Sequence, residues 1–245
     1  REKSRTIEDV AAEARALVND GVKEITLLGQ NVNSYGRDLY GEPRFADVLR
    51  AVSATGVERI RFATSHPKDL TDEVIALFGE LPNLMPALHL PVQSGSDRVL
   101  KAMNRRYTAE HYLDLVRKVR EANPDVAIST DIIVGFPGET EEDFLETCRV
   151  AEICRFSKMH IFRYSKRVGT PAAERDDQVL PEVKAERAKR LEAIEERLRA
   201  DDMRRRCGSR ELGLVESEGN ATTESYHGID APAGSIVGDL VECEL

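Results

Sequence analysis

Apolar positions in the first 165 residues alternate between helical spacing and short continuous runs. The segment Thr6–Asp9 resembles a capping box, and helical spacing through Leu17 predicts a first helix that ends at Gly21. The run KEITLLG then predicts a buried strand. A helical pattern followed by a strand pattern recurs four more times, at roughly thirty-residue spacing. This order predicts a right-handed parallel α/β fold, either a barrel or an open doubly wound sheet.

The later predicted elements follow the same logic. We expect helices over residues 45–53, 72–78, 98–103, 109–121 and 141–153, and strands in RIRFAT, MPALHLP, DVAISTDIIVG and SKMHIFRYS. Residues 181–206 predict one long helix whose mixed Glu and Arg are typical of a solvated face. Beyond Gly208, three strand-like pieces predict a small all-β segment, barely enough for an independent unit. We therefore expect a core domain over 1–180, a connecting helix over 181–207 and a β segment over 208–245.

The beginning of the chain differs from the repeating pattern. The series opens on a helix with no strand in front of it, and the first residue is Arg1 rather than Met. Both features predict that a strand and further residues precede this sequence in the whole protein.

Composition narrows the class of protein. With 245 residues, 41% hydrophobic and 32% charged, the chain suits a globular protein with a full-sized core. No apolar run is long enough for a membrane span, so we expect a cytoplasmic protein. The net charge of −9 argues against indiscriminate nucleic-acid binding but allows a local basic patch. None of the four cysteines lies in a CxxC or CxxxCxxC motif, so they predict no metal site.

The loops after the predicted strands carry the candidate chemistry. In parallel α/β folds, ligands bind where the carboxyl ends of the strands converge, and here these loops are rich in Gly, Ser, Asn and Gln. Asp131 lies within an apolar strand, where a ribose diol, an arginine or backbone groups would satisfy its carboxylate. Gly135 and Gly138 allow close approach of a ligand to the backbone, but the segment lacks a Rossmann GxGxxG and a P-loop lysine. The residues alone predict a parallel α/β enzyme with a nucleotide-like ligand and leave the reaction open.

Five segments together resemble a known family. The segments LLGQNVNSYG, RFATSHPKDLTDEVI, LHLPVQSGSDRVLKAMNRRYT, STDIIVGFPGETEEDF and YSKRVGTPAA occur in the order found in the radical S-adenosylmethionine (radical SAM) methylthiotransferases. The resemblance covers Arg1 to about Arg190, and GQNVNSY and TSHPKD favour the MiaB-like branch. It implies a partial parallel (β/α)6 TIM-like barrel whose first strand is missing here, followed by a TRAM-like all-β segment.

The resemblance also implies a cofactor site for S-adenosylmethionine. Gln30 and Asn31 correspond to positions beside its methionine part, and Arg105 corresponds to an arginine directed at its carboxylate. In the family, a CxxxCxxC triad upstream of a segment like REKSR binds a 4Fe–4S cluster, and an N-terminal domain holds a second cluster. The resemblance implies two 4Fe–4S clusters in the intact protein, with neither ligated by this chain, which would be inactive alone.

The nucleoside half of the cofactor corresponds to later positions. Gln93, Ser94 and Asp131 lie where the family holds ribose hydroxyls. Ile133–Gly135 would form an apolar shelf under adenine, and Tyr164 would lie near the base.

The implied reaction is methylthiolation of carbon 2 of N6-isopentenyladenosine at position 37, beside the tRNA anticodon. The implied partners of a monomeric enzyme are the tRNA anticodon stem-loop, S-adenosylmethionine and an electron donor such as flavodoxin or ferredoxin. Arg204, Arg205 and Arg206 are candidate RNA contacts, although a basic helix end also complements its own dipole. The segment FSKMHIFRYSKRVGTPAA is more similar to the branch that acts on N6-threonylcarbamoyladenosine, which stays open as an alternative substrate. A ribosomal-protein methylthiotransferase, a noncatalytic RNA-binding module and an ordinary nucleotide-binding barrel enzyme are the remaining hypotheses.

Overall fold

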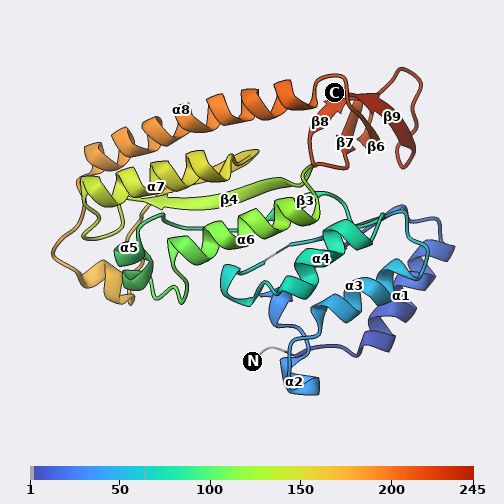
Figure 1. The fold of residues 1–245 in the computed structure, drawn as a ribbon, viewed down its shortest axis with the longest axis horizontal. Coiled ribbons are helices and arrows are strands. Elements are labelled where there is room, and N and C mark those ends of the chain that lie inside the picture. The colour runs from blue at the N-terminus through green and yellow to red at the C-terminus, as the bar shows by residue number, and fades with distance from the viewer. Residues whose placement is uncertain (1–2, 64) are drawn as a thin grey trace. The chain divides into compact units, whose positions relative to one another are not determined.

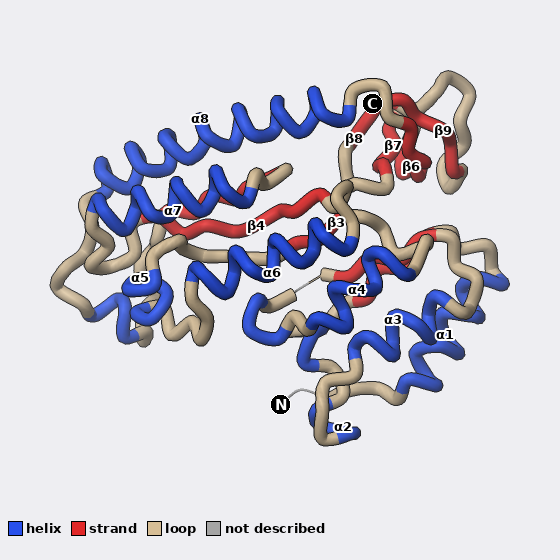
Figure 2. The backbone as a smooth tube through the Cα atoms, in the orientation of Figure 1, coloured by secondary structure: helices blue, strands red, loops and turns tan. Residues whose placement is uncertain are grey.

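The computed structural model describes residues 3–63 and 65–245, and Figure 1 shows the order of their elements. Thr64, in the segment RFATSHPKD, lies outside the described residues, as do Arg1 and Glu2. The helices, drawn in blue in Figure 2, are α1 (Ile7–Asn19), α2 (Arg37–Tyr40), α3 (Phe45–Ser53), α4 (Asp72–Glu80), α5 (Asp97–Ala102), α6 (Ala109–Ala122), α7 (Glu141–Cys154) and α8 (Pro181–Arg206). The strands are β1 (Glu24–Leu27), β2 (Arg59–Phe62), β3 (Ala87–His89), β4 (Ala127–Val134), β5 (Lys158–Arg163), β6 (Arg210–Ser217), β7 (Asn220–Thr223), β8 (Gly228–Asp230) and β9 (Leu240–Glu244).

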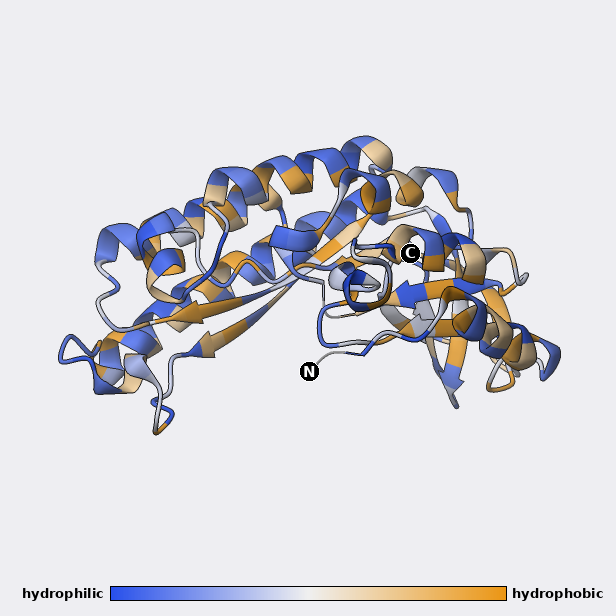
Figure 3. Cartoon of the chain, turned by 90° about the horizontal axis from the view of Figure 1, so that it is seen from below, coloured by the Kyte–Doolittle hydropathy of each residue, from blue (hydrophilic) through white to orange (hydrophobic). Residues whose placement is uncertain are grey.

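The chain forms two compact units. Unit 1 comprises Arg1–His89, Lys118–Ala127 and Arg206–Leu245, and unit 2 comprises Leu90–Arg117 and Ile128–Arg205. This division differs from the domain limits expected from the sequence, which stay a prediction. The helices carry hydrophilic and hydrophobic residues along the same ribbon, as Figure 3 shows, and this mixture is expected for elements with one buried face.

Unit 1 is built on two parallel strands and the helices beside them. Strands β1 and β2 pair in register from Glu24 opposite Arg59 to Leu27 opposite Phe62. The Phe62 ring packs edge-on against Phe45 of α3, with ring centroids 5.2 Å apart, and lies 5.9 Å from Phe78 of α4. Because successive side chains of a strand point to opposite faces, Arg59 is on the face opposite to Phe62.

The C-terminal segment belongs to unit 1 and forms an antiparallel sheet with the strand order β8-β7-β6-β9. Two arginines of β2 hold it. The Arg59 guanidinium donates to the carbonyl oxygens of Thr222 and Thr223 at 3.1 and 3.0 Å, and Arg61 donates to Thr223 at 2.8 Å. Glu24 lies 2.8 Å from Arg59 and 2.9 Å from Arg61, so one carboxylate serves both buried cations. The sheet is thus joined to β2 by charged side chains.

Unit 2 contains most of the second parallel sheet, whose strand order is β3-β4-β5. Strands β4 and β5 pair in register from Ser129 opposite Lys158 to Val134 opposite Arg163. Tyr112 of α6 is fully buried in this unit and packs edge-on against Phe156, with ring centroids 6.3 Å apart.

Most predicted elements are confirmed, and the differences have physical reasons. The five strands of the α/β part and the bounds of α3 agree with the expected pattern. The C-terminal segment has four strands rather than three, because β7, with the sequence NATT, has no apolar alternation to reveal it. The solvated face expected for α8 is only part of that helix, since Arg187, Leu191 and Leu198 are buried. Among the described residues, no helix is both long and apolar enough to cross a membrane.

Candidate functional site

Strand β4 presents two alternating sets of side chains in unit 2. Thr130, Ile132 and Val134 are fully buried, whereas Asp131 and Ile133 are half-buried and point to the other face. Two of the predicted cofactor residues, Asp131 and Ile133, therefore share a partly accessible face. The Val134 side chain points into the core, so only its main chain could contribute to a ligand shelf.

Gln93 runs alongside this face. The backbone N–H of Gln93 donates to the Asp131 carbonyl at 2.8 Å, and its backbone carbonyl accepts from the Ile133 N–H at 2.9 Å. The Gln93 φ of 67° lies in the left-handed region. Ser94 is fully buried, and its hydroxyl lies 3.3 Å from Thr147 Oγ1 and accepts from the backbone amide two residues later. The structure therefore places Gln93 next to Asp131 and gives the Ser94 hydroxyl a role inside the unit.

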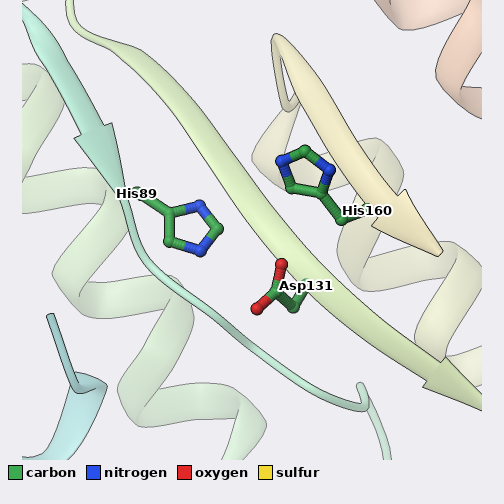
Figure 4. A group of neighbouring side chains, drawn as sticks. All are labelled: His89, Asp131 and His160. Carbon is green, nitrogen blue, oxygen red and sulfur yellow. The ribbon is translucent and has the colours of Figure 1, made fainter. Parts of the chain in front are cut away.

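Asp131 lies next to a histidine that the sequence did not single out. His160 of β5 lies opposite Asp131 in the parallel register, and a carboxylate oxygen and a ring nitrogen of the two residues lie within 4.8 Å of each other. Figure 4 shows these two side chains on neighbouring strands and also labels His89, the last residue of β3. The pair adds a titratable group to the same face as the candidate ribose contact.

The turn after β4 is held on its α7 side by a capping box. Thr140 Oγ1 accepts from the Asp143 amide, and the Asp143 carboxylate accepts from the Thr140 amide at 2.7 Å. Burial of Asp143 opposes its ionisation, but hydrogen bonds from Arg98 and Ser96 outweigh this effect and lower its pKa. Arg98 also donates to the Gly138 carbonyl at 2.6 Å, so α5 and α7 both fix the end of the turn. Thr140 is a helix cap, as the sequence predicts.

Tyr164 follows β5, close to the same turn. Its amide donates to the Val134 carbonyl at 2.9 Å, its ring packs edge-on against Phe136 with centroids 5.3 Å apart, and the Lys184 ammonium lies 5.1 Å from the ring centroid. The Tyr164 hydroxyl is buried and has no hydrogen-bond partner within residues 3–63 and 65–245. Buried polar atoms in folded proteins are mostly bonded to protein groups or to ordered water, so this hydroxyl is an exception that calls for an explanation.

Arg105 is half-buried and follows α5, where its amide donates to the Leu100 carbonyl at 2.9 Å. Burial raises the pKa of Tyr107 to about 12, and the positive charge of Arg105 acts against this rise. The Tyr107 hydroxyl donates to the Val92 carbonyl at 3.0 Å, directly before Gln93. Arg105 therefore lies near the loop that carries Gln93.

Gln30 and Asn31 belong to unit 1, where they line a cavity of about 1030 Å³. The Asn31 amide nitrogen donates to Asp69 Oδ2 at 2.7 Å, and Arg37 lies 2.9 Å from the other oxygen of that carboxylate. The Asn31 amide oxygen is buried without a hydrogen-bond partner in the described part of the chain. These two residues thus contribute polar groups to the lining of this cavity.

The three C-terminal arginines of α8 differ in exposure. Arg204 and Arg205 are exposed and pair with Asp201 and Asp202 one turn earlier. Arg206 is buried, with its guanidinium 3.1 Å from Glu211 Oε1 and donating to the Asp125 carbonyl at 2.9 Å. Arg206 is therefore explained as a structural residue of unit 1, and a surface contact with RNA would fall to Arg204 and Arg205.

The family model for the radical SAM superfamily matches residues 1–151, which is more than half of the chain. This chain belongs to the radical SAM superfamily. The family assignment of the sequence and its parallel α/β class are confirmed, together with the small antiparallel segment at the C-terminus.

Two curated relatives of this radical SAM chain carry the same name. This chain is 52% identical over 228 residues to "tRNA-2-methylthio-N(6)-dimethylallyladenosine synthase" of Thermobifida fusca (strain YX), and the match covers 93% of this chain and 46% of that protein. The protein of the same name from Streptomyces viridosporus is 53% identical over 260 residues, covering 100% of this chain and 51% of the relative. The chain thus spans about half the length of the curated relatives it matches.

Two solved structures share the fold at low sequence identity. Coproporphyrinogen III oxidase from Escherichia coli matches with a TM-score of 0.55 and 19% identity, over 80% of this chain and 47% of that one. Methylornithine synthase matches with a TM-score of 0.51 and 16% identity, over 80% of this chain and 60% of that one. These likenesses show the fold.

Radical SAM proteins use S-adenosylmethionine together with a 4Fe–4S cluster. The partly accessible face of β4 fits the nucleoside part of that cofactor, because it offers a carboxylate at Asp131 and an apolar side chain at Ile133. The orphaned Tyr164 hydroxyl is consistent with a polar ligand at this turn. The residues described do not fit the cluster, since Cys148, Cys154, Cys207 and Cys243 form no group of three ligands among them.

Two charged residues beside the turn were not assigned a role from the sequence of this radical SAM chain. Glu139 stands inside the quoted segment GFPGET, and Thr140 and three acidic residues follow it, so its sequence neighbours do not mark it as buried. Arg187 lies in a helix with a highly charged pattern, and no feature of that pattern marks it as buried. Both become visible only when the turn and α8 are seen together.

Proposed function

We propose that the protein containing this chain is a transferase that methylthiolates carbon 2 of N6-isopentenyladenosine, also called N6-dimethylallyladenosine, in tRNA. The observation that carries the proposal is the 52% identity to the Thermobifida fusca synthase over 93% of the chain. At this level of identity across nearly the whole chain, a change of nucleoside substrate would require differences concentrated in the site, and the same name recurs at 53% and 48% identity in other relatives.

The proposed cofactors are S-adenosylmethionine and two 4Fe–4S clusters, whose ligands lie outside the described residues. S-adenosylmethionine bound to a reduced cluster supplies the radical chemistry. Within this chain, the Asp131 carboxylate would accept hydrogen bonds from the ribose, while Ile133 and the Gly135 backbone would contact adenine. Gln93 is proposed to orient Asp131 from the neighbouring loop, because the two backbones are hydrogen-bonded. Gln30, Asn31 and Arg105 remain proposed contacts of the methionine part.

The proposed partners are the anticodon stem-loop of tRNA and an electron donor such as flavodoxin or ferredoxin, and the proposed setting is a monomer in the cytoplasm. With a net charge of −9, RNA affinity would depend on local cations. Arg204 and Arg205 are the proposed contacts, since both are exposed.

The experiment is nucleoside mass analysis of tRNA from a deletion strain that carries the full-length gene. We expect the methylthio group to return on N6-isopentenyladenosine. Its return only on N6-threonylcarbamoyladenosine would replace the proposed substrate, and its return on neither would overturn the tRNA assignment. A full-length Asp131→Asn variant tests the site in the same strain and should restore less of the modified nucleoside than wild type.

A further inference from the structure

The turn between β4 and α7 is tied to α8 by a buried ion pair in unit 2. Glu139 Oε2 accepts a hydrogen bond from the Gly135 amide at 2.5 Å and another from Arg187 Nη1 at 2.8 Å. The same Arg187 nitrogen donates to the Glu139 carbonyl at 3.2 Å. One carboxylate thus connects the first residue of the turn with a residue of the long helix.

The pair is enclosed. The side chains of Glu139 and Arg187 are 1% and 5% exposed, and the Arg187 guanidinium lies 5.5 Å from the centroid of the Phe144 ring. Arg187 is also 3.6 Å from the exposed Glu141 carboxylate. Burial raises the pKa of Glu139, and the Gly135 amide and Arg187 act against this rise. Without its cation, Glu139 would be a buried charge with no counter-ion, which is costly.

Gly135, the residue of the turn that Glu139 contacts, is also confined by α8. Gly135 has a φ of 70°, and a side chain at this position would overlap the Lys184 stem of α8. Lys184 in turn donates to the Tyr164 carbonyl at 3.0 Å. Two residues of α8, one helical turn apart, therefore contact the turn and the end of β5.

We propose that Arg187 is a positioning residue for the adenosine end of the cofactor site, acting through Glu139 on the Gly135 amide. The inference rests on the proposed placement of S-adenosylmethionine at Asp131–Gly135. Arg187 orients Glu139 through their hydrogen-bonded pair, Glu139 fixes the Gly135 backbone, and that backbone would contact adenine. Arg187 itself touches no substrate or cofactor in this assignment.

The test measures binding of 5′-methylthioadenosine to the full-length protein with its clusters reconstituted. This probe contains the adenosine part of the cofactor and lacks the amino acid part, so methionine serves as the contrasting ligand. For Arg187→Met we expect the Kd of 5′-methylthioadenosine to rise about tenfold, as for loss of one charge-assisted hydrogen bond, and the Kd of methionine to change little. Arg190→Met is the matched control, because Arg190 lies on the same helix but is 38% exposed.

A double-mutant cycle separates positioning from a general loss of structure. If Arg187 acts through Glu139, the double variant of Arg187→Met and Glu139→Gln should bind the probe no more weakly than the worse single variant. Additive effects would overturn the inference, as would an unchanged Kd in Arg187→Met. If Arg187→Met does not fold, the probe is measured with Glu139→Gln, and Glu146→Gln at an exposed position of α7 is the control. An unchanged Kd in Glu139→Gln overturns the inference.

One further variant separates a failure of this inference from a failure of the cofactor placement on which it rests. Asp131→Asn should also weaken binding of 5′-methylthioadenosine. If Asp131→Asn weakens binding and Arg187→Met does not, the positioning role alone fails. If Asp131→Asn leaves binding unchanged, the placement of the cofactor fails, and the inference with it.

Discussion

The contact between β2 and the C-terminal sheet gives a direct test of how unit 1 is held together. Arg59 is 2% exposed, pairs with Glu24 and donates to the carbonyl oxygens of Thr222 and Thr223. Burial lowers the pKa of Arg59, and Glu24 acts against this effect. In Arg59→Met, the Thr222 carbonyl loses its arginine donor. The Thr223 carbonyl still accepts a hydrogen bond from Arg61, and Glu24 still forms an ion pair with Arg61.

The expected cost follows from these contacts. Breaking a buried ion pair costs about 3 to 5 kcal/mol, and the lower end applies here because Glu24 keeps one cation. We therefore expect the free energy for opening the C-terminal sheet to fall by about 3 kcal/mol, which corresponds to a roughly 100-fold change in the opening equilibrium. Hydrogen exchange followed by mass spectrometry should show this acceleration in peptides from β6 and β7.

Arg50→Met is the matched control, because Arg50 is 41% exposed and its pairs with Glu73 and Glu80 lie on the surface. Exposed pairs contribute less than about 1 kcal/mol, so exchange in β6 and β7 should stay near wild type in this variant. Equal exchange rates of these peptides in the two variants would refute the reasoning that buried arginines hold the sheet.

Three further outcomes are expected. Hydrogen bonds lower the pKa of Asp143 in the fold, so this group contributes stability above its unfolded pKa of about 4 and loses it as the pH falls below that value. Urea midpoints of wild type and Asp143→Asn should therefore differ at pH 7 and approach each other toward pH 2, and a constant difference would contradict the assignment. Burial raises the pKa of Cys148 to about 11, whereas Cys207 is exposed, so iodoacetamide at pH 8 should label Cys207 well before Cys148 in a peptide map. Gly135→Ala should lower the melting temperature through about 1 to 3 kcal/mol of backbone strain, because φ at this position is 70° and α8 leaves no room for a methyl group; an unchanged melting curve would show that the turn can relax.

Local patterns predicted the elements of this fold well where apolar spacing is strong. The bounds of α3 match because its buried residues recur at helical spacing, with Phe45, Leu49 and Val52 on one face. Strand β7 was missed because its pairing with β6, from Gly213 opposite Thr223, defines it rather than its own sequence. The strand exists through a tertiary contact that no local window contains.

The candidate site likewise contains residues that the local sequence points to and residues that only contacts between distant segments reveal. Asp131 was proposed because a carboxylate in an apolar strand requires a partner, and Gly135 because it follows that strand, and both stay predictions. His160 could not be linked to Asp131 without the register of β4 and β5, which depends on pairing between distant segments. Arg187 was hidden for another reason, since burial of one arginine among many charged residues leaves no trace in composition.

Helix α8 has 26 residues and is therefore about 39 Å long, and it carries Arg187 near its start and Arg204 near its end. A continuous helix of this length fixes both the distance between these two residues along the axis and the angle between them around it. Inserting one residue between them would turn Arg204 by about 100° relative to Arg187, whereas inserting seven would restore the phase to within about 20°. Length variation in α8 should thus be tolerated in steps of seven or eleven residues rather than one at a time.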